Sequence, residues 1–290
     1  MTDSSYSLAD GAPPPAWRAG RPRRLTPVLW LGVAILALLL AVALFAPWLA
    51  PSDPDGQQLT LRLLPPSSAH PFGTDGLGRD VLSRVLFGTR PTLLLISLVL
   101  LLTVPVGLTV GIAAGMAGGW IETILMRLTD MVLALPKLVL ALAIIAVLGP
   151  GLLKGALALA LTAWPVYARQ ARAETLVLRH SDYLAAARMQ GIHGVRLCFG
   201  HVLPMCLPTT VVRATLDLGG MILAAAGLGF LGLGVPPPTA EWGSMVADGS
   251  AVIFDQWWVA MAPGGAILLA SLAFNLLGDG LRDWLDPRHE

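Results

Sequence analysis

The stretch TLLLISLVLLLTVPVGLTVGIAAGM, from Thr92 to Met116, contains no aspartate, glutamate, lysine or arginine. A helix of about 20 apolar residues crosses the roughly 30 Å hydrocarbon core of a bilayer. This stretch therefore predicts a membrane-spanning helix and argues against a soluble globular fold. The composition agrees, because only 13% of the 290 residues are charged, against about 25% in an average soluble domain.

Five more segments have the same apolar character, and the first of them follows a cluster of arginines between positions 18 and 24. That first segment is too long for the apolar core of a cleaved signal peptide, so we interpret it as an uncleaved anchor. The sequence thus predicts an all-α membrane protein with six transmembrane helices. The five segments are 27–50, Thr123–Leu148, Leu152–Tyr167, Thr209–Val235 and Trp258–Leu277.

These spans divide the chain into parts of different character. Proline and glycine near the N-terminus are typical of a disordered tail. The predicted parts are a disordered cytosolic tail (1–26), the first transmembrane helix (27–50), an extracytoplasmic loop with an amphipathic helix (51–91), a five-helix core (92–280) that includes a cytosolic loop (170–205), and a cytosolic C-terminus (281–290).

Lysines and arginines in short loops indicate the orientation, because they are retained on the cytosolic side. With six spans, the arginines of the N-terminal tail, of the loop 170–205 and of the C-terminal tail all lie on one side. That side is predicted to be the cytosol, with both termini there. The loop 51–91 also contains arginines, but aspartates accompany them and the opposing count is larger.

The extracytoplasmic loop contains apolar residues that recur on one face of a short helix. Thr74 or Asp75 is a suitable N-cap, and Asp80 and Arg84 are spaced to pair at i, i+4. Such a helix either anchors the loop at the membrane surface or forms a ledge where an external partner docks. Its apolar residues are Leu77, Val81, Leu82, Val85 and Leu86.

A stripe of glycines lies within the quoted span at four-residue spacing: Gly107, Gly111 and Gly115, continued by Gly119. Small residues on one face allow two helix backbones to approach closely. The stripe predicts close helix packing, either within this chain or against a second membrane subunit.

The cytosolic loop contains a short helix with clear end signals. Ser181 or Asp182 can cap a helix from Tyr183 to Met189, and Gly191 can end it in the left-handed conformation that glycine tolerates. Such a helix either covers the cytosolic end of its own chain or offers its face to a partner.

This loop resembles the "EAA" signature of binding-protein-dependent ABC permeases. The signature has three small residues, a glycine four positions later, and a Leu-Pro close, which here are Ala185-Ala186-Ala187, Gly191 and Leu203-Pro204. Two positions depart from it, since Ala185 replaces a glutamate and His201 replaces an isoleucine. Three further segments resemble the C-type subunits of dipeptide, oligopeptide and nickel importers: 72–80, 227–243 and 275–287.

The resemblance implies a permease of the type I ABC importer fold in the bacterial inner membrane, in contact with lipid. It implies four protein partners: a homologous B-type permease subunit, two cytosolic ATPase subunits and an extracytoplasmic binding protein. The transported substrate remains open among peptides, nickel and metal chelates. The residues implied to couple the chain to an ATPase are Asp182, Tyr183, Ala185, Ala186, Ala187, Gly191, Leu203 and Pro204.

The chain lacks the G-x-x-x-x-G-K-[ST] phosphate loop of ATPases, and the glycine-rich run from Gly227 to Gly234 has no lysine. It is therefore predicted to be a non-catalytic subunit without a cofactor, and nothing in it indicates a nucleic-acid partner. His193, Cys198, His201 and Cys206 do not match a zinc-site spacing, so no metal site is predicted.

Ionisable residues inside spans are candidates for function because burying charge in a membrane is costly. Asp130, Lys137, Arg213 and Asp217 are candidates for the wall of a pathway or vestibule. Arg127 can pair with Asp130 at i, i+3, and Arg213 with Asp217 at i, i+4, whereas Lys137 has no local partner.

An ion-coupled secondary transporter is the alternative function, with the intramembrane acids as proton sites. It predicts transport by this chain alone and an internal inverted repeat, which the sequence does not show. A membrane-embedded enzyme is a third interpretation, but the chain has no H-E-x-x-H motif.

Overall fold

A computed structural model describes residues 27–285, and within them the only non-helical pairing is one isolated β-bridge between Thr74 and Asp80. The predicted tail 1–26 and the end of the predicted segment 281–290 lie outside the described residues. The helices are α1 (Pro27–Leu49), α2 (Val81–Ala117), α3 (Gly119–Leu133), α4 (Lys137–Leu148), α5 (Leu152–Arg179), α6 (Asp182–Met189), α7 (Gly194–Leu197), α8 (Leu203–Phe230), α9 (Trp242–Ser250) and α10 (Trp258–Leu285), with a 3-10 turn, η1 (Leu59–Leu61), and a π-helical turn, η2 (Cys198–Val202).

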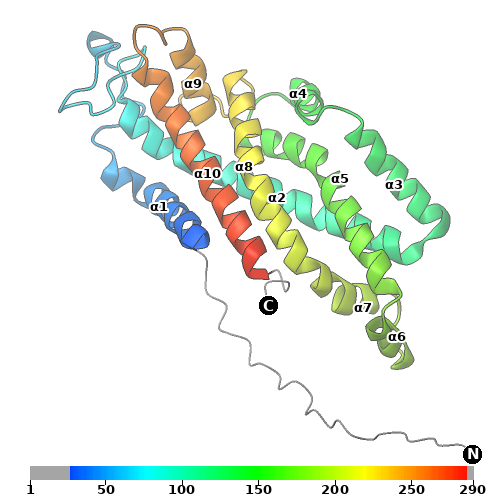
Figure 1. The fold of residues 1–290 in the computed structure, drawn as a ribbon. Coiled ribbons are helices and arrows are strands. Elements are labelled where there is room, and N and C mark those ends of the chain that lie inside the picture. Colours follow the sequence, from blue (N-terminus) through cyan, green and yellow to red (C-terminus); the bar gives the residue numbers. More distant parts are fainter. Residues whose placement is uncertain (1–26, 286–290) are drawn as a thin grey trace, which may run out of the picture.

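The long helices form an elongated bundle with two distinct ends (Figure 1). The loop before α2 and the short helix α9 lie at one end, called the α9 end here. The short helices α6 and α7 lie at the opposite end, called the α6 end. The start of α1 and the last turns of α10 point toward the α6 end.

Four helical stretches among the described residues are long and apolar enough to cross a membrane: α1, α2, α10 and the stretch Gly194–Phe230, which contains α8. The pair α3 and α4 makes a fifth if the two are counted as one bent span. Helix α5 falls outside this set because charged residues, among them Lys154 and Arg169, interrupt its apolar sequence. The protein is therefore an all-helical, multi-pass membrane protein.

The predicted span Thr123–Leu148 is not one continuous helix. Helices α3 and α4 meet at an 88° bend between Leu133 and Lys137. Pro136 explains the break, because proline has no backbone N–H to donate and its ring disfavours the helical conformation of the preceding residue. The bend places Lys137 at the start of a new helix rather than inside a continuous one.

The predicted separate amphipathic helix in the loop 51–91 is also wrong, because residues from Val81 onward are the first turns of the long span α2. The N-cap is Asp80, whose carboxylate accepts a hydrogen bond from the Ser83 N–H at 2.7 Å. Asp80 also contacts His70 and does not pair with Arg84. Asp80 therefore caps the long helix α2, and its contact with His70 also attaches the preceding loop to the start of that helix.

The glycine stripe of α2 faces α5, which lies alongside α2 (Figure 1). A methyl group added at Gly111 would lie 2.3 Å from the Ala168 carbonyl oxygen, and one at Gly107 would lie 2.4 Å from Tyr167 Cβ. Gly115 faces Thr175 in the same way, with a distance of 2.7 Å. The contact that needs these glycines is therefore made within this chain.

The buried side chains form two hydrophobic cores. The larger core includes Ile96, Leu159, Ile222 and the fully buried Trp242. The second core lies at the α6 end and joins α6 to the long helices. It contains Leu108, Ile112, Ala171, Leu184, Ala187, Leu197, Val202 and Cys206.

Candidate functional site

Helix α6 begins and ends with the signals read from the sequence. Of the two candidate caps, Ser181 is the N-cap, and its hydroxyl accepts a hydrogen bond from the Leu184 N–H at 3.4 Å. Gly191 follows the helix with φ of +79°, in the left-handed region that glycine adopts without steric cost. Side-chain and backbone chemistry thus confine this helix to eight residues, Asp182–Met189.

The two faces of α6 have different surroundings. Leu184 and Ala187 are buried in the second core, with 0% and 5% of their surface exposed. Tyr183 and Met189 are 50% and 90% exposed, and Ala186 is exposed as well. The inner face therefore covers the end of its own bundle, and the outer face presents apolar side chains that no part of the described chain covers.

Two polar contacts attach α6 to the long helices. The Arg188 guanidinium donates a hydrogen bond to the Arg179 carbonyl oxygen at the end of α5, at 3.2 Å. The Tyr183 hydroxyl lies 2.8 Å from Nδ1 of His201 in η2, the turn that leads into α8. These contacts attach α6 to the end of α5 and to the turn that precedes α8.

Leu203 and Pro204 form the first turn of α8 directly after η2. Proline is tolerated there because the first helical N–H groups have no intrahelical partner. Leu203 is half-buried and Pro204 is exposed. Both belong to the start of α8, so the two halves of the signature, Ala185–Gly191 and the Leu-Pro pair, lie on either side of the connection formed by α7 and η2.

Asp130 pairs with a residue on a neighbouring helix. Its carboxylate accepts a hydrogen bond from Arg169 of α5 at 2.6 Å. The predicted pair between Arg127 and Asp130 is wrong, because α3 packs alongside α5 and the partner across the interface is better placed. Arg172 of α5 makes a second bridge to α3, with its Nε donating to Glu122 at 2.6 Å.

Arg213 and Asp217 form the predicted i, i+4 pair on α8, with Arg213 Nε 3.2 Å from each carboxylate oxygen. Lys137, the first residue of α4, lies close enough to interact electrostatically with both. Tyr167 of α5 interacts with Asp217 in the same way, although its buried hydroxyl has no hydrogen-bond partner of good geometry in the described chain. We call Lys137, Tyr167, Arg213 and Asp217 the polar cluster.

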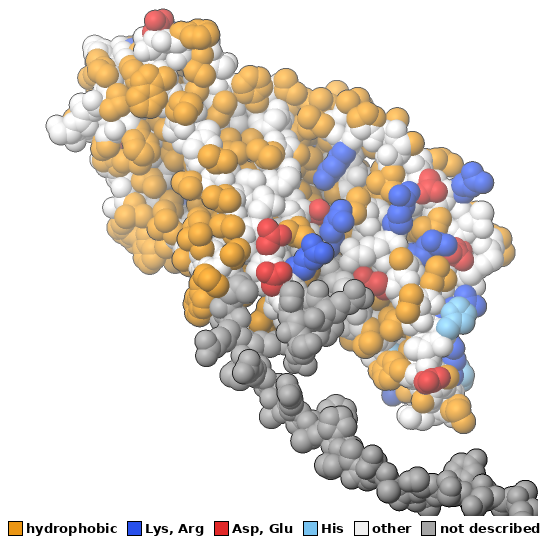
Figure 2. All heavy atoms as spheres, viewed as in Figure 1, with side chains coloured by type: hydrophobic (Ala, Val, Ile, Leu, Met, Phe, Trp, Pro, Cys, Tyr) orange, Lys and Arg blue, Asp and Glu red, His pale blue; other side chains and the backbone are white. Residues whose placement is uncertain are grey.

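Figure 2 shows that charged side chains gather in a band across one face of the bundle, with hydrophobic side chains on both sides of the band. Lys137, Arg213 and Asp130 are exposed, and Asp217 is half-buried. Three sequence segments far apart in the chain supply the cluster, at the α3–α4 bend, in the middle of α5 and in α8. The polar cluster and the Asp130–Arg169 pair together bring charge to an otherwise apolar surface.

A buried charge network lies at the α9 end, and the sequence analysis did not find it. Arg79 donates from Nε to Asp75 at 2.6 Å, and only 6% of Arg79 is exposed. Arg84 is 3% exposed and donates to the Pro54 carbonyl oxygen at 2.9 Å and to Asp55 at 3.3 Å. These contacts hold the loop 51–80 against the start of α2, where it covers that end of the bundle.

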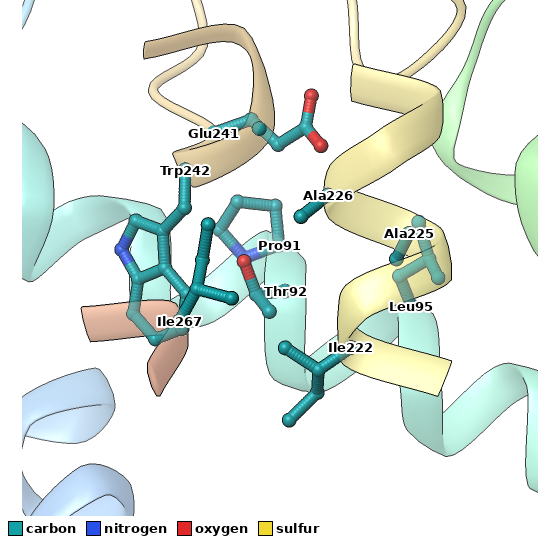
Figure 3. Close-up of a pocket in the computed structure, with 10 residues that line it drawn as sticks. Pro91, Thr92, Leu95, Ile222, Ala225, Ala226, Glu241, Trp242 and Ile267 are labelled. Carbon is teal, nitrogen blue, oxygen red and sulfur yellow. The ribbon is translucent and has the colours of Figure 1, made fainter. Parts of the chain in front are cut away.

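Glu241, just before α9, is another buried charge that the sequence analysis did not single out. Only 4% of it is exposed, and burial raises the pKa of its carboxyl group to about 7, although a hydrogen bond from the Val235 N–H at 3.2 Å opposes this. Gly229 and Gly234 make room for it, because a methyl group at either position would lie within 2.3 Å of a carboxylate oxygen. Figure 3 shows its carboxyl group at the edge of a small, mainly apolar cavity.

The described residues contain no group of three or more His, Cys, Asp or Glu side chains arranged to hold a metal ion. Within that part of the chain, Cys198 and Cys206 are free thiols. The arrangement offers a peripheral helix attached to two long helices, and a charged band on those same helices.

Comparison with known proteins adds two family matches. Residues 107–290 match the model described as "Binding-protein-dependent transport system inner membrane component". Residues 26–66 match the model described as "N-terminal TM domain of oligopeptide transport permease C". The first match covers the glycine stripe, the α6 end and the polar cluster.

Individual relatives agree with these matches. The chain is 46% identical over 263 residues to the probable D,D-dipeptide transport system permease protein DdpC of Escherichia coli K12, covering 91% of this chain and 88% of the relative. It is 46% identical over 264 residues to the di/tripeptide transport system permease protein DppC of Pseudomonas aeruginosa UCBPP-PA14, covering 89% and 87%. It is 42% identical over 257 residues to the nickel transport system permease protein NikC of Escherichia coli K12, covering 89% and 93%.

Proposed function

The chain belongs to the family of binding-protein-dependent transport system inner membrane components, and from this premise we propose that it forms half of the translocation pathway of an ABC importer. Its relatives are permease proteins of dipeptide, tripeptide and nickel transport systems. The proposed substrates are accordingly peptides, nickel or metal chelates, delivered by an extracytoplasmic binding protein. ATP hydrolysis is assigned to separate subunits, since this chain has no phosphate loop.

The observation that carries the proposal is the position of α6. An apolar surface on a helix that is anchored on one side and open on the other fits the groove of a partner. Tyr183, Ala186 and Met189 present that surface, and the anchoring contacts lead directly to α5 and α8. Together with the rest of the coupling residues, Asp182, Ala185, Ala187, Gly191, Leu203 and Pro204, they are assigned to contact with an ATPase subunit or to support of that contact.

The proposed topology has six spans: α1, α2, the bent pair α3–α4, α5, the stretch containing α8, and α10. It places the α6 end, with Arg179, Arg188 and Arg196, in the cytosol, in agreement with the retention of positive loops on that side. Both termini are then cytosolic, and α9 and the loop 51–80 face the outside of a bacterial inner membrane. Pairing with a homologous B-type permease subunit completes the pathway.

The proposed mechanism is alternating access. Closure of two ATPase subunits on ATP moves α6, and the contacts from Arg188 and from Tyr183 pass the displacement to α5 and α8. Those two helices carry Tyr167, Arg213 and Asp217, so their movement opens or closes the polar surface. Asp130, Lys137, Arg213 and Asp217 are assigned to the wall of the pathway or its cytosolic vestibule.

Site-specific photo-cross-linking tests the coupling assignment in the full assembly. The chain is co-expressed with its genomically adjacent ATPase, permease and binding-protein genes, and a photoreactive amino acid replaces Met189. The matched control replaces Phe254, which is 99% exposed at the opposite end of the bundle. We expect Met189 to capture the ATPase and Phe254 not to. Capture of the ATPase from Phe254, or from neither position, contradicts the proposal.

The alternative of an ion-coupled secondary transporter makes a different prediction. It requires the purified chain alone to accumulate substrate in proteoliposomes when a proton or sodium gradient is imposed. The proposed role as a permease subunit of an ABC importer predicts that no substrate accumulates without the ATPase subunits and ATP.

A further inference from the structure

Arg90 of α2 is held against α1 by two hydrogen bonds. Its Nε donates to the Ala43 carbonyl oxygen at 2.5 Å, and its Nη2 donates to the Leu44 carbonyl oxygen at 3.1 Å. Pro47 explains why the first acceptor is available, because proline has no N–H to donate to the carbonyl group four residues earlier in the helix. The guanidinium of Arg90 therefore supplies a hydrogen bond that α1 cannot make by itself.

The same contacts fix the orientation of the guanidinium. Its Nε and Nη2 atoms form one edge of the planar group, and its central carbon lies 5.5 Å from the centre of the Phe87 ring. A guanidinium has five N–H donors in a rigid fork. The edge formed by Nη1 and the second Nη2 hydrogen has no hydrogen-bond partner among residues 27–285. Arg90 is exposed, so this edge is a preformed pair of donors that an external acceptor can reach.

Arg90 also lacks a counter-charge, because no carboxylate of the described chain lies within 4.0 Å of it. This distinguishes it from other arginines that do have a carboxylate at that distance: Arg79, Arg84, Arg169, Arg172 and Arg213. The carbonyl groups of α1 are dipoles and do not neutralise a full positive charge. An unpaired charge is costly on a surface that faces lipid, so the site is suited to a ligand with negative charge.

Both helices place Arg90 at the boundary between the lipid headgroups and the acyl chains. On α2 it comes just before the uncharged stretch Thr92–Met116, which is long enough to cross the hydrocarbon core. On α1 its partners lie about one turn before Trp48, which is 77% exposed and has its ring 5.7 Å from that of Phe45. Exposed tryptophan near the end of a span is typical of the membrane interface. The guanidinium therefore lies near the depth of the phosphate groups of one leaflet.

The surface on the hydrocarbon side of Arg90 is apolar and exposed. Leu94 lies one turn deeper on the same face of α2, and Leu101 lies two turns beyond Leu94. On α1, Leu44 and Leu40 continue the exposed surface in the same direction. A cationic donor edge above aliphatic side chains matches the two parts of a phospholipid. The planar edge of arginine is also suited to phosphate, whose oxygens accept two parallel hydrogen bonds from it.

We propose that Arg90 is a binding site for the phosphate group of a membrane phospholipid, at the contact between α1 and α2. The phosphate accepts hydrogen bonds from Nη1 and Nη2, and an acyl chain lies along Leu94. With the proposed topology, this lipid belongs to the outer leaflet. A free phosphate ion has the same charged group but no acyl chain to bury, so it binds far more weakly. The inference goes beyond the proposed function and does not depend on the transported substrate.

Photo-cross-linking with lipid tests the site in the full assembly, purified with its ATPase, permease and binding-protein partners. The assembly is kept in dodecyl maltoside, an uncharged detergent without phosphate, and receives phosphatidylglycerol with a diazirine on one acyl chain. Adducts are assigned to peptides by mass spectrometry. The internal control is an exposed apolar surface of α10, which has no lysine or arginine before Arg282. This surface includes Leu268, Leu269 and Leu272.

We expect adducts on the segments 40–48 and 90–101 to exceed those on α10 by about tenfold, which corresponds to one charge-assisted contact. Diacylglycerol with the same photoreactive chain has no phosphate and shows no such preference. Inorganic phosphate at millimolar concentration does not compete. Arg90→Gln lowers the ratio of adducts to near unity. The matched control is Arg62→Gln, which removes an exposed arginine of the loop 51–80 and leaves the ratio unchanged.

Arg90→Lys separates the planar donor edge from the charge. Lysine keeps the positive charge but presents a point charge in place of the fork, so the ratio is expected to fall several-fold from the wild-type value and to stay above that of Arg90→Gln. If Arg90→Gln does not assemble, because it also loses the hydrogen bonds to α1, the comparison of Arg90→Lys with the wild type decides the result. Assembly yield and melting temperature are measured for each variant.

Several outcomes overturn the proposal. They are equal adduct formation on the two surfaces of the wild type, a ratio that neither Arg90 variant lowers, equal capture of diacylglycerol, and competition by inorganic phosphate. A photoreactive amino acid at Leu94 that captures the partner permease in native membranes assigns Arg90 to that subunit and also overturns the proposal. None of these measurements requires transport, so they can still be interpreted if the proposed function fails.

Discussion

The hydroxyl of Tyr183 and Nδ1 of His201 lie 2.8 Å apart, and they connect α6 to the turn that leads into α8. His201 stands where the signature that this loop resembles has isoleucine, so the chain has a polar side chain at a position where that signature is apolar. The rings are also close, with centroids 5.6 Å apart. This contact joins a surface helix to a membrane-spanning helix that contributes to the polar cluster.

The first prediction concerns this pair. Tyr183→Phe and His201→Ala each remove the hydrogen bond, and each is expected to lower uptake per ATP hydrolysed several-fold without preventing assembly. Because both changes break one contact, the double variant should be little worse than either single variant. Uptake and phosphate release are measured in the same proteoliposomes. Fully additive losses would show that the two residues act separately.

The second prediction concerns Gly191, which has φ of +79° after α6. Valine is strained in that conformation, by about 1–2 kcal/mol or more, so Gly191→Val should displace the end of α6. We expect ATP hydrolysis to continue and uptake to fall about tenfold or more. Gly200→Ala is the control, since Gly200 has no positive φ and no atom within 4 Å of an added methyl group. Normal uptake by Gly191→Val would remove the role assigned to this residue.

The third prediction concerns the glycine stripe. A methyl group at Gly111 would lie 2.3 Å from a backbone carbonyl oxygen of α5, which has no flexible side chain to move aside. Gly111→Ala is expected to lower the free energy of unfolding by about 1–3 kcal/mol, seen as a lower melting temperature in detergent. Gly264→Ala, where an added methyl group meets nothing within 4 Å, should leave it unchanged. Equal melting temperatures for the two variants would contradict the packing argument.

The fourth prediction is a pH dependence that arises from Glu241. Burial raises the pKa of its carboxyl group from 4.5 to about 7 in the folded protein. The folded state then holds a proton that the unfolded state releases, so stability is highest below pH 4.5 and falls as pH rises toward 7. Glu241→Gln should remove this dependence, because glutamine stays neutral and can still accept the hydrogen bond from Val235.

Thermal unfolding between pH 4.5 and pH 8 checks the fourth prediction. The variant and the wild type should melt together at the low end of this range, and the variant should melt higher above pH 7. Asp248→Asn is the control, because Asp248 lies on α9 with 62% of its side chain exposed. This variant should keep the pH dependence of the wild type. If the melting temperatures of the wild type and of Glu241→Gln change with pH in the same way, ionisation of Glu241 does not destabilise the folded protein, and the prediction fails.

Features that depend on a short stretch of chain could be predicted from the sequence. The length of an apolar run determines whether a helix can cross a bilayer, and the serine before Asp182 and the glycine after Met189 determine where α6 begins and ends. The Arg213–Asp217 pair was also predictable, because both residues lie on one helix at i, i+4. The family resemblance rested on spacings of the same kind.

Features that depend on the distance between helices were not predictable in this way. Asp130 pairs with Arg169 of α5 in preference to Arg127, and no local spacing indicates this partner. The 88° bend at Pro136 was not predicted either, because the angle between α3 and α4 depends on what the two helices pack against. The start of α2 was misread because its first turns are amphipathic, and a loop folded over them supplies their polar partners.

The sequence by itself determined that this protein is helical, lies in a membrane and presents a capped helix between two spans, because apolar length and cap chemistry are local properties. Only the tertiary structure decided which charges meet. Lys137, Tyr167 and Asp217 come together because the bend after α3, the glycine contact between α2 and α5, and the packing of α8 bring three helices to one point. Electrostatic interactions act through space, so the function proposed for these residues follows from that convergence and not from their order in the chain.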